Sequence, residues 1–243
     1  FVPDSGYGIS QEQWEALGDR LGLNDPLWKQ YVDWVGRTLR GDLGVSLARD
    51  RAVTELLRGK IGATVQLAIG SWVFAIALGI PMGVLAAVKR GSGWDYFGRG
   101  LAIVGQAAPP FVTALVAIWI FAVWLEWLPA GGRSPEFNWK EYLLPCMALG
   151  WGAAASLMRL TRSSMLEVLD SEYIRLARAK GVNWNWVIYK HALRNALIVP
   201  VTSALLTFSG WLNGALVVEI VFSWPGIGYE ALYRAVNDND FPL

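Results

Sequence analysis

The residues of this chain that could carry out covalent or metal chemistry are few and scattered. There is one histidine, His191, and one cysteine, Cys146, and no carboxylates recur beside either at the spacing of a metal site. The sequence has neither a phosphate-binding G-x-x-x-x-G-K-[ST] loop nor a nucleophile elbow. Cys146 has no partner for an intrachain disulfide and is expected to pack inside an apolar segment. The sequence therefore predicts a chain that is not an enzyme and binds neither a cofactor nor a metal.

A basic segment between two apolar ones is the more informative feature. The stretch "EYIRLARAKGVNWNWVIYKHALRNAL", Glu172–Leu197, holds several Lys and Arg residues, the only histidine and two closely spaced tryptophans. Residues 172–180 favour a helix, Gly181 is placed to end it, and Val187 and Ile188 begin the apolar face of a second helix. A short helix turned by a glycine and joined to an apolar segment could transmit a push from a soluble protein.

The apolar segments themselves indicate a membrane protein. The chain is 54% hydrophobic and only 17% charged, which is too apolar for an ordinary soluble domain. Four stretches without any charged residue are near or above the ~20 residues that cross a hydrocarbon core. We therefore predict an all-α integral membrane protein with spans at about 61–88, 100–125, 142–160 and 195–218.

The charges between these spans predict their orientation. Lys and Arg exceed the acids in Lys89–Arg99 and in Arg159–Arg194, whereas the connection 128–141 is balanced and the tail after Val218 is acidic. The positive-inside rule places the two basic segments in the cytoplasm and the others outside. The span interiors hold no ionisable residue, which argues against an ion-coupled carrier that powers itself. The energy for transport is therefore expected from a partner.

The segments flanking the spans complete the predicted organisation. Residues 1–60 form an extracytoplasmic helical segment, in which Ser10 and Gln13 open one helix and Asp25-Pro26 open a second that Gly41 ends. We expect this segment to pack on the membrane bundle, with a docking surface for an outside partner as the alternative. Residues 61–243 form the membrane domain, with a cytoplasmic loop at 162–194 and an outer tail at 219–243. A further span is expected before residue 1 and another after residue 243.

Three interpretations of the basic loop remain open on these grounds. It could lie on anionic lipid, as basic amphipathic helices do. It could be a helix-turn-helix that reads DNA, but both of its ends are tied closely to membrane spans. It could also be the element through which a cytosolic motor drives the spans.

The loop resembles that of the permease subunits of ABC transporters, of the dipeptide/oligopeptide/nickel importer type. These carry E-A-A-x-x-x-G and, further on, I-x-L-P. Here Arg175-Leu176-Ala177 stand at E-A-A and Gly181 at the glycine, while His191 and Leu193 stand at the isoleucine and leucine and Arg194 replaces the proline. The peptide-type branch reads Y-I-R-x-A-R-A-K-G and H-A-L-x-N-A, which the chain spells at 173–181 and 191–196.

Other segments resemble the same branch in the same order. "EIVFSWPGIG", Glu219–Gly228, is similar to its E-x-[IV]-F-x-x-P-G-[LIV]-G segment. "MRLTRSSMLEVL" at 158–169, "GIPMGVLAAVKRG" at 79–91 and the pieces of 22–47 match as well. The resemblance therefore covers nearly the whole chain. It implies a type I importer-like transmembrane domain, of whose usual six spans four are present here.

The resemblance also implies a function. The chain would form half of a translocation pathway for di- or oligopeptides in a bacterial or archaeal cytoplasmic membrane, and ATP would be hydrolysed on other chains. Its expected partners are a second permease subunit, two cytosolic ATPases, an extracytoplasmic solute-binding protein and the bilayer, but no nucleic acid. The residues expected to couple to the ATPase are Tyr173, Arg175, Ala177, Arg178, Gly181, His191 and Leu193. The family motif of the outer tail comprises Glu219, Phe222, Pro225, Gly226 and Gly228.

Two alternatives accompany this interpretation. Within the same family, the substrate could be nickel or another small solute, because the same loops occur there. In another class, the chain would be a membrane scaffold that transports nothing and whose basic loop binds lipid.

Overall fold

The computed structural model describes residues 25–46 and 49–237, except the side chains at 209, 212–214 and 232. The helix predicted around Ser10 and Gln13 lies outside these residues. The chain divides into two compact units, one comprising Phe1–Leu56 with Asn239–Leu243 and the other comprising Leu57–Asp238.

The first unit contains one helix and a small β-ladder among its described residues. Helix α2 (Leu27–Leu39) ends before Gly41, whose φ of 82° explains the glycine. The predicted start of this helix was one residue early: Pro26 is the cap, and the Asp25 carboxylate binds Lys29 Nζ at 3.0 Å instead. Strands β1 (Val45–Ser46) and β2 (Arg51–Ala52) pair antiparallel, so the prediction of an all-α chain was wrong at this short ladder.

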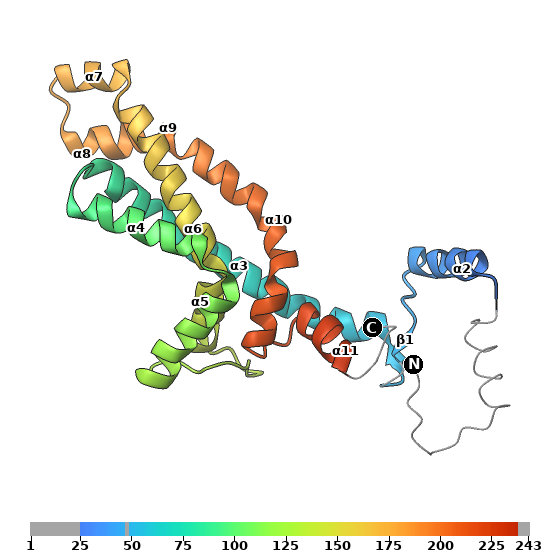
Figure 1. Ribbon diagram of the computed structural model, residues 1–243. Coiled ribbons are helices and arrows are strands. Elements are labelled where there is room, and N and C mark those ends of the chain that lie inside the picture. Colours follow the sequence, from blue (N-terminus) through green and yellow to red (C-terminus); the bar gives the residue numbers. More distant parts are fainter. Residues whose placement is uncertain (1–24, 47–48, 238–243) are drawn as a thin grey trace. The chain divides into compact units, whose positions relative to one another are not determined.

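The second unit is a bundle of helices (Figure 1). Its elements, in chain order, are α3 (Val53–Val88, which begins in the first unit), α4 (Gly93–Ala107), α5 (Pro110–Ala117), η1 (Ile118–Trp124), α6 (Trp139–Leu169), α7 (Glu172–Ala179), α8 (Trp184–Trp186), η2 (Val187–Ala192), α9 (Leu193–Ala196), α10 (Ile198–Val221), η3 (Tyr229–Arg234) and α11 (Ala235–Asn237). The elements written η are π-helical.

Two helices of the described part, α3 and α6, are long and apolar enough to cross a membrane. A third candidate is the pair formed by α4 and the helix Pro110–Trp124, which are bent by 113° with respect to each other. The predicted span 100–125 is thus not one straight helix. Pro109 and Pro110 cause the break, because proline lacks an N–H and drives the residue before it, Ala108, into an extended conformation.

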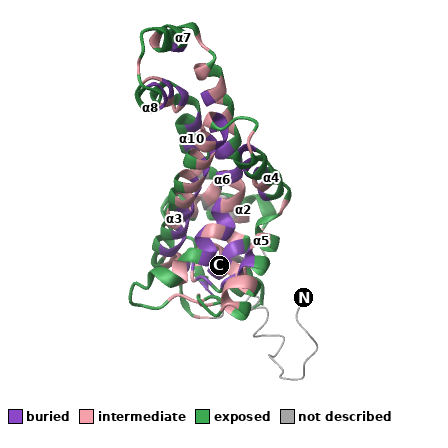
Figure 2. Ribbon diagram, turned by 90° about the vertical axis from the view of Figure 1, so that its left-hand side faces the viewer, coloured by how far each residue is buried: buried purple, intermediate pink, exposed green. Residues whose placement is uncertain are grey.

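Close packing of α3 on α6 holds the bundle together. A Cβ atom at Gly79 would lie 2.6 Å from the Ala154 carbonyl oxygen, so only a glycine allows the two backbones to approach so closely. Helix α6 runs to Leu169, beyond the predicted end of its span, and buries residues along most of its length (Figure 2). The first residues assigned to the cytoplasmic loop therefore belong to this helix.

An ion pair joins α4 to the same helix. Asp95 is only 1% exposed, and its carboxylate accepts hydrogen bonds from Arg162 Nε at 2.7 Å and Arg162 Nη2 at 3.1 Å. Arg99 Nε lies 3.3 Å away, and the Gly91 N–H donates to the same carboxylate at 3.0 Å. Asp95 therefore fixes the start of α4 against α6.

We predict that Arg162→Ala destabilises the protein strongly, by about 3 kcal/mol, because it leaves the buried Asp95 carboxylate without its main partner. The expected result is a clearly lower thermal unfolding midpoint of the purified protein. Arg175→Ala is the matched control: it breaks an exposed pair with Glu172, and its midpoint should stay close to that of the wild type. Equal midpoints for the two variants would contradict this role of Asp95.

Candidate functional site

The basic loop is a helix–Gly–helix, as predicted. Helix α7 ends with Lys180 as its cap, and Gly181 follows with a φ of 78°, a conformation that favours glycine. The Gly181 N–H donates to the Arg178 carbonyl at 2.9 Å. The Asn183 side chain then caps α8 by accepting the Asn185 N–H at 2.9 Å. Hydrogen bonds within the loop therefore close the turn.

Beneath the loop lies a buried apolar cluster that binds it to the membrane helices. Ile174 of α7, together with Val187 and Ala192 of η2, is fully buried against Ala87 of α3 and Met165 of α6. Because protein interiors are packed as densely as organic crystals, a displacement of α7 must displace the ends of α3 and α6 as well. We call these five residues the underside cluster.

The residues predicted to couple do not all lie on one surface. Tyr173, Arg175, Arg178 and Gly181 are exposed, whereas Ala177, His191 and Leu193 are half-buried, and Leu193 packs against the underside cluster. The Tyr173 hydroxyl accepts a hydrogen bond from Asn195 Nδ2 at 3.0 Å and so ties α7 to α9.

The sequence predicted the apolar face at Val187 and Ile188, which lies in this cluster, but it did not identify Ile174. Ile174 is the one buried residue of α7, yet its neighbours Tyr173 and Arg175 drew attention because they match a family pattern. The burial of Ile174 could have been predicted, because an isoleucine between two polar positions of a short basic helix needs an apolar partner.

The outer motif forms a second site, centred on a buried carboxylate. Glu219, predicted on the outer tail, lies instead in the last turn of α10 and is fully buried. Its Oε1 accepts a hydrogen bond from Thr64 Oγ1 at 2.6 Å, and its Oε2 accepts the Tyr229 N–H at 3.0 Å. Thr64 Oγ1 in turn accepts the Ile227 N–H at 2.9 Å. Glu219 and Thr64 together pin the segment after α10 onto α3.

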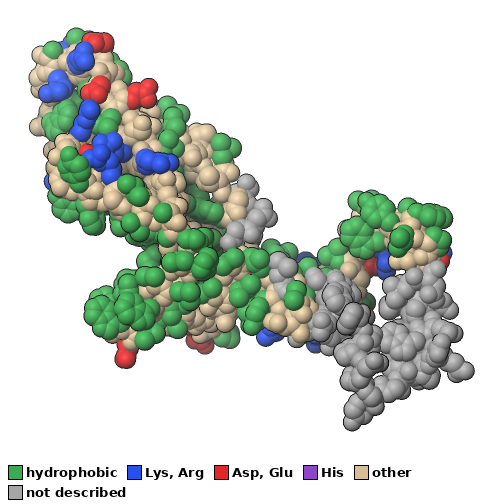
Figure 3. All heavy atoms as spheres, in the orientation of Figure 1, with side chains coloured by type: hydrophobic (Ala, Val, Ile, Leu, Met, Phe, Trp, Pro, Cys, Tyr) green, Lys and Arg blue, Asp and Glu red, His purple; other side chains and the backbone are tan. Residues whose placement is uncertain are grey.

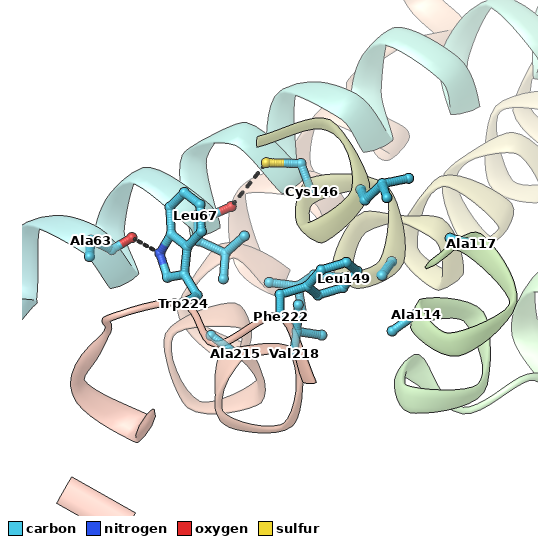
Figure 4. Close-up of a cluster of buried hydrophobic side chains, with 12 residues drawn as sticks. Ala63, Leu67, Ala114, Ala117, Cys146, Leu149, Ala215, Val218, Phe222 and Trp224 are labelled. Atoms are coloured by element: carbon cyan, nitrogen blue, oxygen red, sulfur yellow. Dashed lines mark hydrogen bonds between the residues drawn. The ribbon is translucent and has the colours of Figure 1, made fainter. Parts of the chain in front are cut away.

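The remaining motif residues make this arrangement possible. A Cβ atom at Gly226 would overlap the Glu219 carboxylate, and one at Gly228 would lie 2.9 Å from Glu219 Oε2. Phe222 and Trp224 are buried in the adjoining apolar cluster, where Trp224 Nε1 donates to the Ala63 carbonyl at 2.9 Å (Figure 4). Trp224 and Thr64 were not predicted as members of this site. Thr64 has no signal in the sequence, because it is distant from the motif along the chain.

Cys146 lies in the same apolar cluster, next to Leu67 (Figure 4). It is buried and unpaired, as predicted from its apolar surroundings. Within the described residues, no group of three or more His, Cys, Asp or Glu side chains could hold a metal ion.

The fold and these two sites define a helical membrane component whose polar loop is packed rigidly onto its spans. Residues 79–242 match the family described as "Binding-protein-dependent transport system inner membrane component". The chain belongs to this family. It is therefore a multi-pass protein of the inner membrane and a permease subunit of an ABC importer, and the dependence on a binding protein implies partner chains for solute binding and ATP hydrolysis.

Individual relatives agree with this assignment. The dipeptide transport system permease protein DppB of Alkalihalophilus pseudofirmus is 41% identical over 98% of this chain and 79% of the relative. The glutathione transport system permease protein GsiC of Escherichia coli O6:H1 is 39% identical over 94% of this chain and 74% of the relative. A crystal structure of an amino acid ABC transporter with histidines superposes with a TM-score of 0.54 at 16% identity, over 78% of this chain and 82% of that chain. This last likeness concerns the fold alone.

We predict that Gly226→Ala disrupts the outer site, because the added methyl group must displace the buried Glu219 carboxylate. Overpacking of this kind costs about 1–3 kcal/mol. The measurement is the thermal unfolding midpoint, together with protease cleavage after α10. Gly210→Ala, in a helical position where a Cβ atom meets nothing within 4 Å, is the control and should behave like the wild type. If Gly226→Ala resists heat and protease as well as the control, the packing of Gly226 on Glu219 does not stabilise the protein.

Proposed function

We propose that this chain forms half of the translocation pathway of an ATP-driven importer for peptides and is driven by a cytosolic ATPase through the loop at 172–194. The observation that carries the proposal is the underside cluster, which joins the exposed surface of α7 to the ends of α3 and α6 through buried apolar contacts. A motor bound to α7 could therefore move the spans.

The proposed domain has a type I importer-like architecture with four spans, at about 61–88, 100–125, 142–160 and 195–218, out of an expected six. The 24-residue length of α10 supports the fourth span. The second proposed span, 100–125, contains the bend at Pro109. In this arrangement residues 1–60 and 219–243 lie outside. The partners are a second permease, two ATPases and a solute-binding protein that contacts the outer segments.

The distribution of aromatic side chains supports two membrane interfaces. Exposed Trp and Tyr residues concentrate at the interfaces of membrane proteins. One exposed aromatic group surrounds the connection predicted outside, and it consists of Trp124, Trp127, Phe137 and Trp139. Another surrounds the basic segments predicted inside, and it consists of Trp94, Tyr96, Trp184, Trp186 and Tyr189. The two groups belong to opposite ends of the bundle (Figure 1).

A peptide substrate is supported by the relatives, which are permeases of dipeptide and glutathione transport systems, and glutathione is itself a short peptide. Nickel remains the alternative within the family, although the described residues contain no cluster that could hold a metal ion. Membership of a transport family leaves no support for the scaffold alternative.

The coupling proposal predicts that Gly181→Pro abolishes ATP-dependent uptake. Proline fixes φ near −65° and removes the N–H that closes the turn, so α7 cannot keep its orientation. Gly181→Asn is the matched control, because asparagine tolerates a positive φ and a Cβ atom at this position meets nothing within 4 Å. Uptake and co-purification of the ATPase with the permease are measured for both variants.

A second variant, Ala177→Glu, places a charge on the half-buried side of α7 and should weaken ATPase co-purification. Wild-type uptake and ATPase association in both Gly181→Pro and Ala177→Glu would show that this loop does not couple the two proteins.

The substrate proposal predicts saturable, ATP-dependent uptake of a labelled dipeptide by the complete transporter in proteoliposomes. Excess unlabelled di- and tripeptides should compete with it, whereas Ni²⁺ at the same concentration should not. Uptake of ⁶³Ni²⁺ without peptide uptake would assign the chain to the nickel alternative.

A further inference from the structure

The second half of the loop carries a groove on the side that faces away from the underside cluster. Four exposed residues, Asn185, Trp186, Tyr189 and Lys190, line this groove, which is shallow and open. Val187 and Ile188, which lie between them in the sequence, are buried. The short helical segment thus has one apolar side packed against the bundle. Its other side is open, and the exposed lining there is mostly apolar, with a few polar groups beside the aromatic rings.

The groove offers donors and a positive charge but no negative charge. The Lys190 ammonium lies 5.1 Å from the centre of the Trp186 ring. None of the ion pairs among the described residues includes Lys190. Asn185 and Tyr189 add an amide and a hydroxyl, and no lining residue would repel an anion. A phosphate group, with its negative charge and several acceptor oxygens, is the ligand that this set of groups fits.

The surroundings of the groove have the character of a membrane interface. Three further cation–ring pairs lie in the basic segments: Lys89 over Trp94, Arg99 over Tyr96, and Arg178 over Trp184, at 4.7–5.8 Å. Lys and Arg side chains gather at this end of the bundle (Figure 3). Aromatic rings beside basic residues are typical of the level of the lipid head groups.

From these observations we infer that the groove formed by Asn185, Trp186, Tyr189 and Lys190 binds the phosphate of an anionic phospholipid head group. The bound lipid fixes the depth of α8 and η2 in the cytoplasmic head-group layer, while α7 stays available to the ATPase on the other side of the Gly181 turn. The inference rests on the proposed cytoplasmic position of the loop. It assigns lipid binding and coupling to two different halves of that loop.

The test measures lipid retention by the complete transporter. The complex is purified from nanodiscs that contain equal amounts of phosphatidylglycerol and phosphatidylcholine, and the lipids that remain bound are identified by native mass spectrometry. We expect wild-type protein to retain phosphatidylglycerol selectively and Lys190→Gln to lose about fivefold of that selectivity. Lys180→Gln removes the same charge from the same loop outside the groove and should retain wild-type selectivity.

Three results would overturn the inference. In the first, the two variants retain phosphatidylglycerol equally. In the second, inorganic phosphate at millimolar concentration displaces the lipid. In the third, Lys190→Gln loses the ATPase while its lipid retention is unchanged, which would make the groove part of the ATPase interface. Co-purification of the ATPase is recorded on the same samples. If Lys190→Gln and Lys180→Gln retain phosphatidylglycerol equally while ATPase binding and uptake are intact, this inference alone is refuted. The Gly181 and Ala177 variants test the proposed function.

Discussion

The arrangement of the loop depends on Ile174 of α7, which is buried against the ends of α3 and α6. Most of α7 is exposed, and its charged residues pair locally, as Arg175 does with Glu172. Such exposed pairs contribute little and leave the helix free to shift. The apolar cluster in which Ile174 lies with Met165 and Ala87 binds α7 to the bundle. Its contacts are short-ranged and close-packed, so they can transmit a displacement that surface charges could not.

Helix α3 connects this cluster to the site at the opposite end of the bundle. Ala87, near its C-terminal end, belongs to the underside cluster, and Thr64, near the start of its apolar stretch, binds the Glu219 carboxylate. One continuous helix thus carries a contact of the loop at one end and a contact of the outer motif at the other. Pro81 lies between these two contacts, but the helix continues through it without a break, so its two ends remain linked by one helix. The segment broken at Pro109 is not continuous in this way, because its two halves are bent by 113°.

Features that depend on one short segment were predictable from the sequence, and features that depend on distant partners were not. The charge-free stretches are local properties of the chain, and they predicted the long helices α3 and α6. The turn at Gly181 is also local, and its positive φ agrees with the prediction. Asp95 counted as one acid in a basic connection, and its burial depends on Arg162, far along the chain. Glu219 was predicted on the outer tail, and its burial was not, because its partner Thr64 is distant along the chain. A motif shows that these residues are needed together, but only the packing shows that Gly226 is small because the carboxylate occupies its space.

The two tryptophans of the loop contribute to two different surfaces of one basic segment. Trp184 lies under Arg178 and so closes the turn between α7 and α8, whereas Trp186 lies under Lys190 and lines the groove. Being two residues apart on a helix, the two rings point in different directions. The charges above them act in water and are weakened by salt, whereas the underside cluster is apolar and is not. Raising the ionic strength should therefore weaken the electrostatic contacts of the loop's outer surface, whereas its apolar contacts with α3 and α6 should persist.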